Sequence, residues 1–528
     1  MCIRDRIYTG GREKDIKRVK DSRGLTAIEV LNELCDDKNP LHLGTFYHHL
    51  DYPNGPYGAN VWTAVGMVNG HPCLLEATNN VCYGGALFPE TIEKIVRHQI
   101  RAETIGGVNY IIFNDSAGLY LPLQIRSFAG PSGFDHIMAH NARMKKRRCK
   151  LLGIQTGPGV AGGGYRLGNC QNHYIMEGGF EVISGQAIIQ GAQGFEVDPA
   201  VFGGPWVHCP NGYASGYFKN IQTAIKAIRE LILSGSPNNM DRNRIFPPRD
   251  PLYDPDELKG ILPYQDSYTR PYDLEDILAR ILDGSEICEI TDGRGKDYGK
   301  GVFTGLGVVD GFIFGIIGTR YGLYVSREGE NKIAGFLSRE DLFRMTQFLQ
   351  HCDQAKYPIV WFQDIKAFES GPQAEAEALL KHGSLLMDQI IYHSIPQMTI
   401  ILRNASGAGH YAFCSEGFGP VYTLGTTHAK NIVMEPIILA QALHHARGDL
   451  IIDGNRFIPV SSEAQKRFEK TLEMIEKDDN PYKEANFGTF NEIIKLSEIR
   501  EYIKMFLRLT NYEPDYPPER NTYFSGLK

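Results

Sequence analysis

A glycine-rich turn follows one of the apolar runs of the chain. In "LLGIQTGPGVAGGGYRLG", from Leu151 to Gly168, five glycines lie between Thr156 and Tyr165. Glycine lets a ligand approach the peptide N–H groups closely. If a helix begins at such a turn, its first amides have no internal acceptor and carry partial positive charge. Two such amides aimed at one point stabilise an oxygen that becomes anionic during a reaction, so the turn is a candidate oxyanion site.

A second turn of small residues lies 246 residues further along the chain. "NASGAGHY" ends at Tyr411 as "GVAGGGY" ends at Tyr165, and each follows a strand-like apolar run. A single glycine turn could serve only the close packing of a helix on a strand. Two copies at equivalent places favour a function. The residues therefore predict a reaction with two developing oxyanions on two different molecules.

Two other motifs imitate binding sites. The first turn contains the spacing GxGxxG, beginning at Gly157, which is typical of dinucleotide-binding loops. The second turn does not keep this spacing, and the unit begins with a hairpin rather than with the motif. "YHHLD" resembles a metal cluster, but His48 and His49 are adjacent and would point to opposite faces of a strand. We therefore predict neither a dinucleotide site nor a metal site.

The two turns belong to two copies of a longer unit. An Asn-Gly hairpin signal at Asn69 is matched by Asp-Gly at Asp310, 241 residues later. The strand-like runs "NYIIFND" and "PIVWFQD" end at Asp115 and Asp364, 249 residues apart. Helical patterns precede these runs at 92–103 and 340–351. Buried strands that alternate with helices predict an α/β fold, with a mainly parallel sheet and outer helices in each copy.

Length and composition suggest how the copies are organised. A chain of 528 residues is longer than one hydrophobic core usually organises. The segment 237–272 is rich in Pro, Asp and Tyr, which is typical of a linker. We therefore predict domains at 24–236 and 273–528. A last helical pattern, from Phe490 to Leu509, closes the chain.

The composition also excludes several classes of function. A net charge of −7 leaves no basic excess with which to neutralise nucleic-acid phosphates. Ten cysteines without any CxxC pair argue against a zinc ribbon or a thioredoxin-type motif, and isolated thiols suit a reducing cytosol. The apolar stretch 302–317 contains Asp310 and four glycines, so it predicts two strands rather than a membrane span. We expect a cytoplasmic protein.

The first residues have a separate explanation. "MCIRDR" is also what a common adaptor of sequencing libraries would encode. We therefore expect that the native N-terminus is missing from this sequence.

Six segments, in order along the chain, carry a resemblance to a known family. They are "GPGVAGGGY" (157–165), "GGFEVISGQAIIQG" (178–191), "YDLEDILARILDGSEICEI" (272–290), "YPIVWFQD" (357–364), "SIPQMTIILRNASGAGHYA" (394–412) and "FGTFNEIIKLSEIREYI" (487–503). In these segments the sequence resembles the carboxyltransferase subunits of biotin-dependent acyl-CoA carboxylases and decarboxylases. The likeness is closest to the α-subunits of glutaconyl-CoA decarboxylases.

The resemblance implies a fold and a separate substrate for each domain. It implies two tandem crotonase-like (ClpP/crotonase) domains, the first for the acyl-CoA and the second for biotin. The active site would lie between them, usually across a dimer interface. By position, the amides of Gly162 and Gly163 would hold the thioester oxygen as an enolate forms. Those of Ala408 and Gly409 would hold the ureido oxygen of biotin.

Two residues that flank the second turn are further candidates for biotin binding by the same resemblance. They are Gly407 and His410. We expect the imidazole of His410 to pack or hydrogen-bond rather than to catalyse. The chemistry requires no side-chain base, because the ureido nitrogen of biotin can exchange the proton.

The resemblance also implies partners. The sequence contains no "AMKM"-like biotin attachment site, so biotin must arrive on another polypeptide, a biotin carrier protein. Biotin carboxylase or membrane decarboxylase subunits are possible further partners, and we expect a homodimer or a higher oligomer. The acyl chain and the direction of transfer stay open. The alternative is a catalytically silent subunit that binds CoA or serves as a scaffold.

Overall fold

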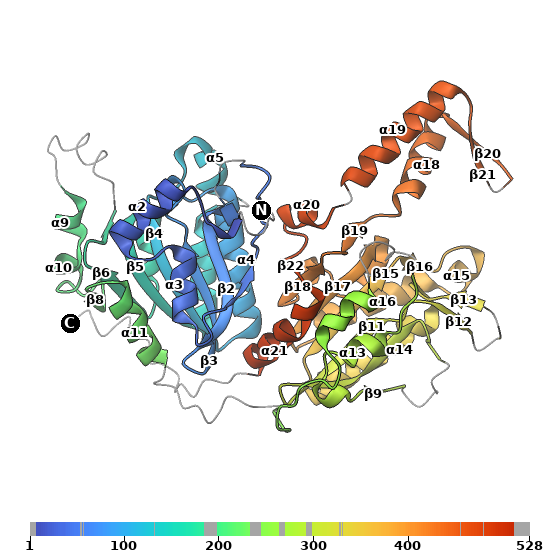
Figure 1. Ribbon diagram of the computed structural model, residues 1–528, viewed down its shortest axis with the longest axis horizontal. Helices are drawn as coiled ribbons and strands as arrows, with labels where there is room; N and C mark the ends of the chain where they lie inside the picture. Colours follow the sequence, from blue (N-terminus) through green and yellow to red (C-terminus); the bar gives the residue numbers. More distant parts are fainter. Residues whose placement is uncertain are drawn as a thin grey trace. The chain divides into compact units, whose positions relative to one another are not determined.

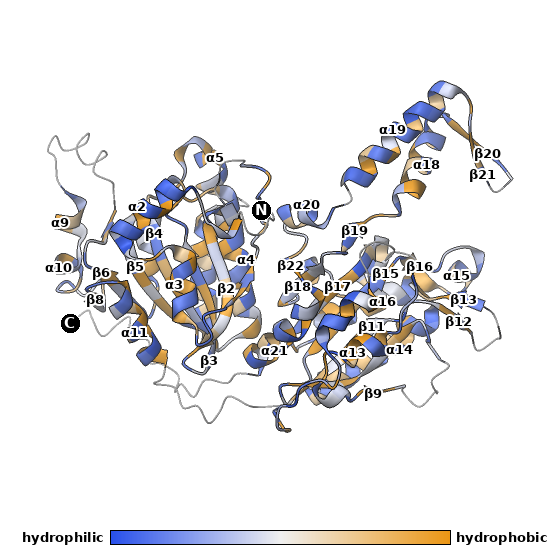
Figure 2. Ribbon diagram, viewed as in Figure 1, coloured by the Kyte–Doolittle hydropathy of each residue, from blue (hydrophilic) through white to orange (hydrophobic). Residues whose placement is uncertain are grey.

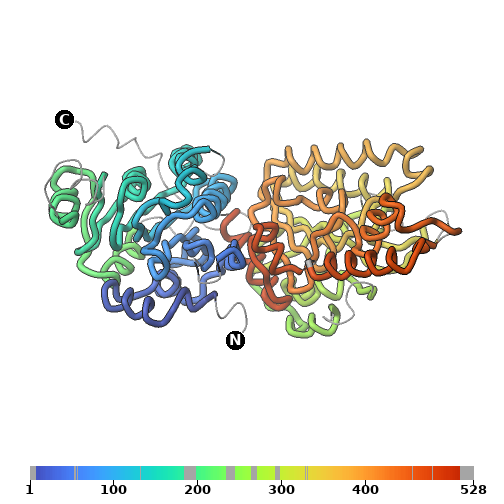
Figure 3. Tube along the Cα trace, turned by 90° about the horizontal axis from the view of Figure 1, so that it is seen from above, coloured from blue at the N-terminus to red at the C-terminus, as the bar shows by residue number. Residues whose placement is uncertain are grey.

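The computed structural model describes residues 7–52, 55, 57–130, 133–183, 198–232, 244–262, 270–291, 298–326, 329, 331–454, 456–478 and 480–511. The start "MCIRDR", parts of the expected linker (237–243 and 263–269) and residues 184–191 of the second resembling segment lie outside the described residues. The chain divides into two compact units, residues 1–243 with 505–528 and residues 244–504 (Figures 1 and 3). The domain limits expected from the sequence stay predictions.

Unit 1 is built on one eight-stranded sheet. Its order is β1-β2-β3-β4-β5-β6-β8, with β7 paired to the end of β5. The first three strands are antiparallel and the rest are parallel. The strands are β1 (Leu41–Leu43), β2 (Val61–Val68), β3 (His71–Thr78), β4 (Asn109–Ser116), β5 (Lys150–Val160), β6 (Asn172–Met176), β7 (Phe180–Val182) and β8 (Gly216–Phe218).

Helices cover both faces of this sheet. One face carries α3 and α11 (Figure 1), whose Val30 and Ile221 line the same pocket as Ala77 and Phe113; the other carries α4, α6 and α7. Successive strand residues point to opposite faces, so Glu76 faces α7 while Ala77 faces α3. The helices are α2 (Glu13–Arg23), α3 (Ala27–Leu34), α4 (Pro89–Ile105), α5 (Gln124–Ser127), α6 (Asp135–Lys146), α7 (Gly162–Gly168), α9 (Pro199–Gly203), α10 (Pro205–His208) and α11 (Ile221–Ile232).

Unit 2 repeats this plan around a second eight-stranded sheet. Its order is β22-β18-β17-β15-β11-β10-β9, with β19 paired to the end of β17. The strands are β9 (Cys288–Glu289), β10 (Val302–Val309), β11 (Phe312–Thr319), β15 (Ile359–Ile365), β17 (Gln397–Ser406), β18 (Tyr422–Thr426), β19 (Lys430–Ile432) and β22 (Glu492–Ile494). Three small two-stranded sheets accompany it, formed by β12 (Leu323–Val325) with β13 (Asn331–Ile333), β14 (Phe336–Leu337) with β16 (Ala367–Phe368), and β20 (Leu450–Asp453) with β21 (Arg456–Pro459).

The helices of unit 2 include a long one at the position of α4. It is α14 (Arg339–Ala355), which begins at a capping box formed by Ser338 and Asp341. The others are α12 (Leu258–Ile261), α13 (Leu274–Leu278), α15 (Pro372–Ala376), α16 (Leu379–Tyr392), α17 (Gly407–Tyr411), α18 (Pro436–Ala446), α19 (Ser462–Asp478) and α20 (Pro481–Asn486). Figure 2 shows hydrophobic residues along the central strands of each sheet. Every residue of β4 and β15 is buried.

Both predicted hairpins form at the expected residues. Strands β2 and β3 are joined by Asn69 and Gly70, with φ of 54° and 80°. Strands β10 and β11 are joined by Asp310 and Gly311, with φ of 55° and 78°. Two successive residues in the left-handed region define the type I′ turn that suits a twisted hairpin. The interpretation of 302–317 as two strands rather than a membrane span is therefore confirmed, and no described helix is long and apolar enough to cross a membrane.

The last predicted helix begins later than expected. The pattern from Phe490 to Leu509 is not one helix, because Glu492–Ile494 form β22 and pair in parallel with β18. The helix α21 extends only over Ile499–Thr510. A short apolar run does not distinguish a buried strand from a helix end, and here the free edge of a sheet accepts it as a strand.

Candidate active site

The first glycine-rich turn joins β5 to α7. Ala161 stands between them with φ 51° and ψ −116°, a backbone conformation that an L-residue rarely adopts. Its amide donates to the carbonyl of Val182, and its own carbonyl accepts from Gly164 and Tyr165. The amides of Gly162 and Gly163 have no hydrogen-bond acceptor among the described residues. They are the first two amides of a helix, where no acceptor within the helix exists.

The second turn joins β17 to α17 in the same way. Gly407 has φ 54°, close to that of Ala161 in the first turn. The carbonyl of Ala408 accepts from Ala412 at 3.3 Å. Within the described part of the chain, the amides of Ala408 and Gly409 donate to no acceptor. Each turn thus presents two helix-terminal amides, as the oxyanion prediction requires, and their role stays a prediction.

A strand irregularity before each turn shows that the two turns are structurally equivalent. The register of β4 and β5 slips so that the single residue Asp115 faces 156–158. The register of β15 and β17 slips in the same way, so that Asp364 faces 402–404. Beyond each slip a short strand joins the edge, β7 beside β5 and β19 beside β17. The offsets of 249 and 246 residues seen in the sequence are therefore the offsets of the structure.

The glycines of the first turn have different roles. A Cβ at Gly157 would overlap the carboxylate of Asp115, and one at Gly159 would lie 2.7 Å from Gln155. These two glycines of the GxGxxG spacing serve close packing within the sheet, and the absence of a dinucleotide site stays a prediction. A Cβ at Gly163 would meet nothing closer than 3.6 Å. Packing therefore does not demand glycine at this position.

Gly409 is packed more tightly than Gly163, the equivalent residue of the first turn. A Cβ at Gly409 would lie 2.9 Å from Cγ1 of Ile365, and one at Gly407 would lie 3.2 Å from the carbonyl oxygen of Val433. A side chain at either position therefore presses on the unit itself as well as on any ligand. The first turn is the better place to separate packing from binding.

His410 lies on α17 and is buried inside unit 2. Its Nδ1 lies 3.2 Å from the side-chain amide of Gln363, and its Nε2 accepts from Nδ2 of Asn431 at 3.2 Å. Burial lowers its pKa to about 4. The imidazole is therefore neutral near pH 7 and fastens α17 to β15 and β19. Contact of His410 and Gly407 with biotin stays a prediction.

A buried ion pair lies under α7 and was missed by the sequence analysis. Arg166, on α7, pairs with Glu76 of β3, and both side chains are fully buried. The hydroxyl of Tyr110 donates to the second oxygen of Glu76 at 2.7 Å. A glutamate within the otherwise apolar run of β3 was the available signal. The pair fastens the helix that carries the first turn to the centre of the sheet.

The other candidates are now placed. His48 and His49 lie in a turn rather than in a strand, and Nδ1 of His49 lies 2.6 Å from the carbonyl oxygen of Phe46. Within the described ranges, no group of three or more His, Cys, Asp or Glu side chains could hold a metal ion. The first turn belongs to unit 1 and the second to unit 2.

Comparison with known proteins identifies the family. A family model described as a carboxyl transferase domain matches residues 22–523. The mitochondrial methylcrotonoyl-CoA carboxylase beta chain of Arabidopsis thaliana is 28% identical over 490 residues, which cover 90% of this chain and 79% of that protein. Glutaconyl-CoA decarboxylase subunit alpha of Acidaminococcus fermentans is 24% identical over 548 residues, covering 98% and 89%.

A solved structure shares the fold. The beta subunit of geranyl-CoA carboxylase from P. aeruginosa has a TM-score of 0.81 at 21% identity, and the match covers 98% of this chain and 93% of that one. The predicted fold class, α/β with two crotonase-like domains, is confirmed. The predicted enzyme class, a biotin-dependent acyl-CoA carboxyltransferase, is confirmed by the same match over nearly the whole chain. The chain therefore belongs to the carboxyl transferase domain family.

Proposed function

We propose that this chain transfers a carboxyl group between biotin on a separate carrier protein and a 2-enoyl-CoA thioester. The observation that carries the proposal is the pair of equivalent turns, each with two helix-terminal amides that have no acceptor among the described residues. Both relatives named above act, by their names, on thioesters with a double bond next to the carbonyl. Loss of a γ-proton or of carbon dioxide from such a thioester moves negative charge onto the thioester oxygen.

Each turn has a role in stabilising charge. The amides of Gly162 and Gly163 would donate to the thioester oxygen, whose charge grows as the enolate forms. Donors that are already oriented by the fold need not reorganise during the reaction. The amides of Ala408 and Gly409 would donate to the ureido oxygen of biotin. Biotin, when bound, supplies the nitrogen that carries the carboxyl group and exchanges the proton.

The side chains around the turns fit a reaction without a protein base. His410 is the imidazole next to the second turn, and both of its ring nitrogens are engaged within unit 2. Its low pKa keeps it neutral, and its place in the structure fixes the helix. At the equivalent position the first turn has Gly164, which has no side chain. The backbone amides are therefore the groups of this chain that act on the reacting oxygens.

The test measures biotin-dependent release of carbon dioxide. The full chain is incubated with free biotin and, in turn, with glutaconyl-CoA, 3-methylglutaconyl-CoA and methylmalonyl-CoA. We expect turnover with the first two esters and little with the third. Binding of these esters without biotin-dependent turnover of any of them would contradict the proposal and favour the silent CoA-binding subunit. Turnover of methylmalonyl-CoA alone would keep the carboxyl transfer and overturn the 2-enoyl class.

The remaining expectations belong to the same proposal. Biotin would arrive on a carrier protein, and a homodimer or higher oligomer would bring the two kinds of turn together. Sedimentation of the purified chain, alone and with a biotinylated carrier, tests both expectations. A cytoplasmic location also stays a prediction.

A further inference from the structure

Asp115 is a buried carboxylate beside the first turn. Its side chain is 4% exposed, and it is the residue of β4 that faces the irregular segment 156–158 of β5. Its Oδ2 accepts from Nε of Arg23, on helix α2, at 2.9 Å. Its Oδ1 forms no well-aligned hydrogen bond with a described residue, and the side-chain amide of Asn80 is near enough to favour the charged carboxylate. Burial raises the pKa of this carboxyl, while Arg23 and the amide of Asn80 oppose that shift.

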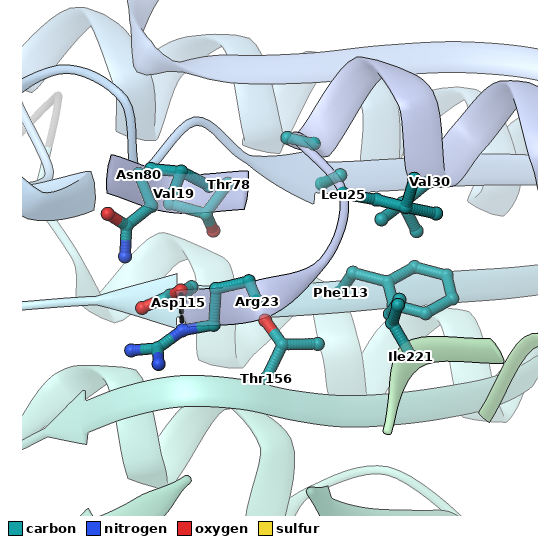
Figure 4. A pocket seen from close by; sticks show the side chains of 12 residues that line it. Val19, Arg23, Leu25, Val30, Thr78, Asn80, Phe113, Asp115, Thr156 and Ile221 are labelled. Carbon is teal, nitrogen blue, oxygen red and sulfur yellow. Dashed lines mark hydrogen bonds and ion pairs between the residues drawn. The ribbon is translucent and has the colours of Figure 1, made fainter. Parts of the chain in front are cut away.

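A small pocket opens at this ion pair. Figure 4 shows Arg23 reaching from α2 to Asp115, with Asn80 and Thr156 nearby and apolar side chains such as Phe113 further in. The cavity holds about 30 Å³, which is room for roughly one water-sized group. Among the described residues, Arg23 is the cation that forms an ion pair with the carboxylate of Asp115 beside this pocket.

The equivalent carboxylate in unit 2 is bonded differently. Oδ2 of Asp364 accepts from Nε of Arg403 at 2.7 Å, and its Oδ1 accepts from the backbone and side-chain amides of Asn404 at 3.0 and 2.7 Å. Both donors lie in the irregular segment of β17 itself. Unit 2 thus bonds this carboxylate with residues of the irregular segment itself.

Unit 1 cannot do the same. The register places Gly157 at the position of Arg403 and Pro158 at that of Asn404. Glycine offers no guanidinium and proline no N–H group, so Oδ1 of Asp115 lacks the two donors that serve Asp364. The guanidinium comes instead from Arg23, 92 residues earlier, and a Cβ at Gly157 would lie 2.6 Å from its Nη2.

The neighbours of Asp115 border the first turn. A Cβ at Gly163 would lie 3.6 Å from the side chain of Asn114 and 3.8 Å from the carbonyl oxygen of Ser116. Asn114 and Ser116, the chain neighbours of Asp115, therefore lie beside Gly163, and we expect a shift of Asp115 to reach the first turn through them. Without Arg23 the buried carboxylate would have to take up a proton or move toward water.

We propose that Arg23 is a positioning residue of the first turn, and that helix α2 belongs to the acyl-CoA side of the active site through its ion pair with Asp115. This inference rests on the proposed function, since the first turn is taken to hold the thioester oxygen. Arg23 acts through Asp115 and the strand irregularity and does not touch the substrate.

The test compares Arg23→Ala with Arg12→Ala in the full chain. Arg12 forms an exposed ion pair with Asp15 at the start of the same helix, so it controls for loss of a charge on α2. We expect Arg23→Ala to lower kcat about tenfold or more, as misplacement near a reacting group does, with KM changed less than threefold. Free guanidinium at millimolar concentration should restore part of the loss, and Arg23→Lys should lose less. Arg12→Ala should behave as the wild type.

A second readout needs no activity. Amide hydrogen exchange of residues 155–168 is followed in wild type, Arg23→Ala and Arg12→Ala, and we expect faster exchange in Arg23→Ala only. Unchanged exchange and unchanged kcat in a folded Arg23→Ala would overturn the inference. If the wild type turns over no ester, the proposed function fails while exchange still decides the role of Arg23. If Arg23→Ala does not fold, Arg23→Gln takes its place in the same comparison.

Discussion

The two units have the same turns but different cores beneath them. Under the first turn lie the charged and hydroxyl-bearing side chains of Glu76, Tyr110 and Arg166, bonded to one another. The register of the sheets and the position of the turns place Ile317, Ile359 and Ala412 at the equivalent points of unit 2, all buried in its hydrophobic cluster.

This difference separates what the turn requires from what it tolerates. Both units keep the strand irregularity, a residue with positive φ at the start of the turn and two amides without an acceptor among the described residues. The residues that support the helix from below are ionic in one unit and apolar in the other. A buried ion pair often adds no more stability than well-packed apolar residues would, but removing one partner leaves an uncompensated charge. The geometry of the backbone is thus the shared feature, and the core is the variable one.

The largest loss of turnover is expected from substitutions that block the turns themselves. Gly163→Val and Gly409→Val each place a branched side chain beside the amides, so we expect turnover to fall by about 10²–10³-fold or more, the loss seen when one oxyanion donor is removed. Steady-state kinetics with free biotin measures it. Gly163→Ala sharpens the comparison, because the nearest atom lies 3.6 Å away and the fold has room for the methyl group.

Variants at the two turns should lose similar amounts of activity but differ in the stability of the folded protein. Gly409→Val also presses on Ile365 at 2.9 Å, so we expect it to lower the denaturation midpoint, whereas Gly163→Ala should not. Near-wild-type turnover of folded Gly163→Val and Gly409→Val would show that neither turn holds a reacting oxygen.

The next largest effect is a loss of stability, expected when the buried ion pair of unit 1 is broken. Arg166→Met leaves the buried carboxylate of Glu76 without its cation, so we expect a loss of about 3–5 kcal/mol in the free energy of unfolding. The double variant Glu76→Leu with Arg166→Met makes this core resemble that of unit 2, and we expect it to recover at least half of the loss. Urea denaturation of the three proteins measures the coupling. A double variant less stable than Arg166→Met alone would mean that apolar residues cannot replace the ion pair in unit 1, although they occupy the equivalent positions in unit 2.

In unit 2 a pH effect is expected from His410. His410 has a folded-state pKa of about 4, below its unfolded value near 6.5. Its contribution to stability is therefore present above pH 6.5 and is lost as the pH falls toward 4. The full difference corresponds to about 3 kcal/mol. The stability of wild type minus that of His410→Gln should shrink as the pH is lowered from 7 to 4.5. A difference that stays constant would mean that the imidazole is protonated or accessible in the folded protein.

Local signals made much of the fold predictable. Asn-Gly and Asp-Gly dipeptides identified both hairpins, and the apolar runs before each turn identified the central strands of both sheets. The helix that begins at each turn followed from small residues after a strand. These features depend on neighbours in the sequence, so periodicity and turn chemistry were sufficient to find them.

The supporting contacts of the site could not be predicted in this way. Arg23 and Asp115 are 92 residues apart, and Glu76 and Arg166 are 90 apart. Nothing in the local pattern of α2 distinguishes Arg23 from the other basic residues of that helix. The edge strand β22 was missed for a similar reason, because its conformation is set by the strand beside it. Tertiary pairing decided each of these features.

The smallest effect concerns a residue with positive φ at the start of each turn: Ala161 directly precedes α7, and Gly407 is the first residue of α17. A positive φ of this kind costs an L-residue about 1–3 kcal/mol and glycine almost nothing. Gly407→Ala should therefore destabilise unit 2 by about 1–2 kcal/mol, with a further cost from the carbonyl oxygen of Val433 at 3.2 Å. Ala161→Gly removes the strain but gives the unfolded chain more freedom, so we expect a net gain of about 0.5–1 kcal/mol.

Paired urea denaturation of Ala161→Gly and Gly407→Ala measures this difference. Opposite signs would show that the two turns adopt one backbone geometry and that unit 1 tolerates strain where unit 2 avoids it. Strain at a functional site persists only where the surrounding structure enforces it. The helix that enforces it in unit 1 is fastened to the sheet by Arg166 and Glu76. A destabilised Ala161→Gly would mean that the alanine methyl group packs favourably, and the left-handed φ would then be a by-product of that packing rather than a requirement of the turn.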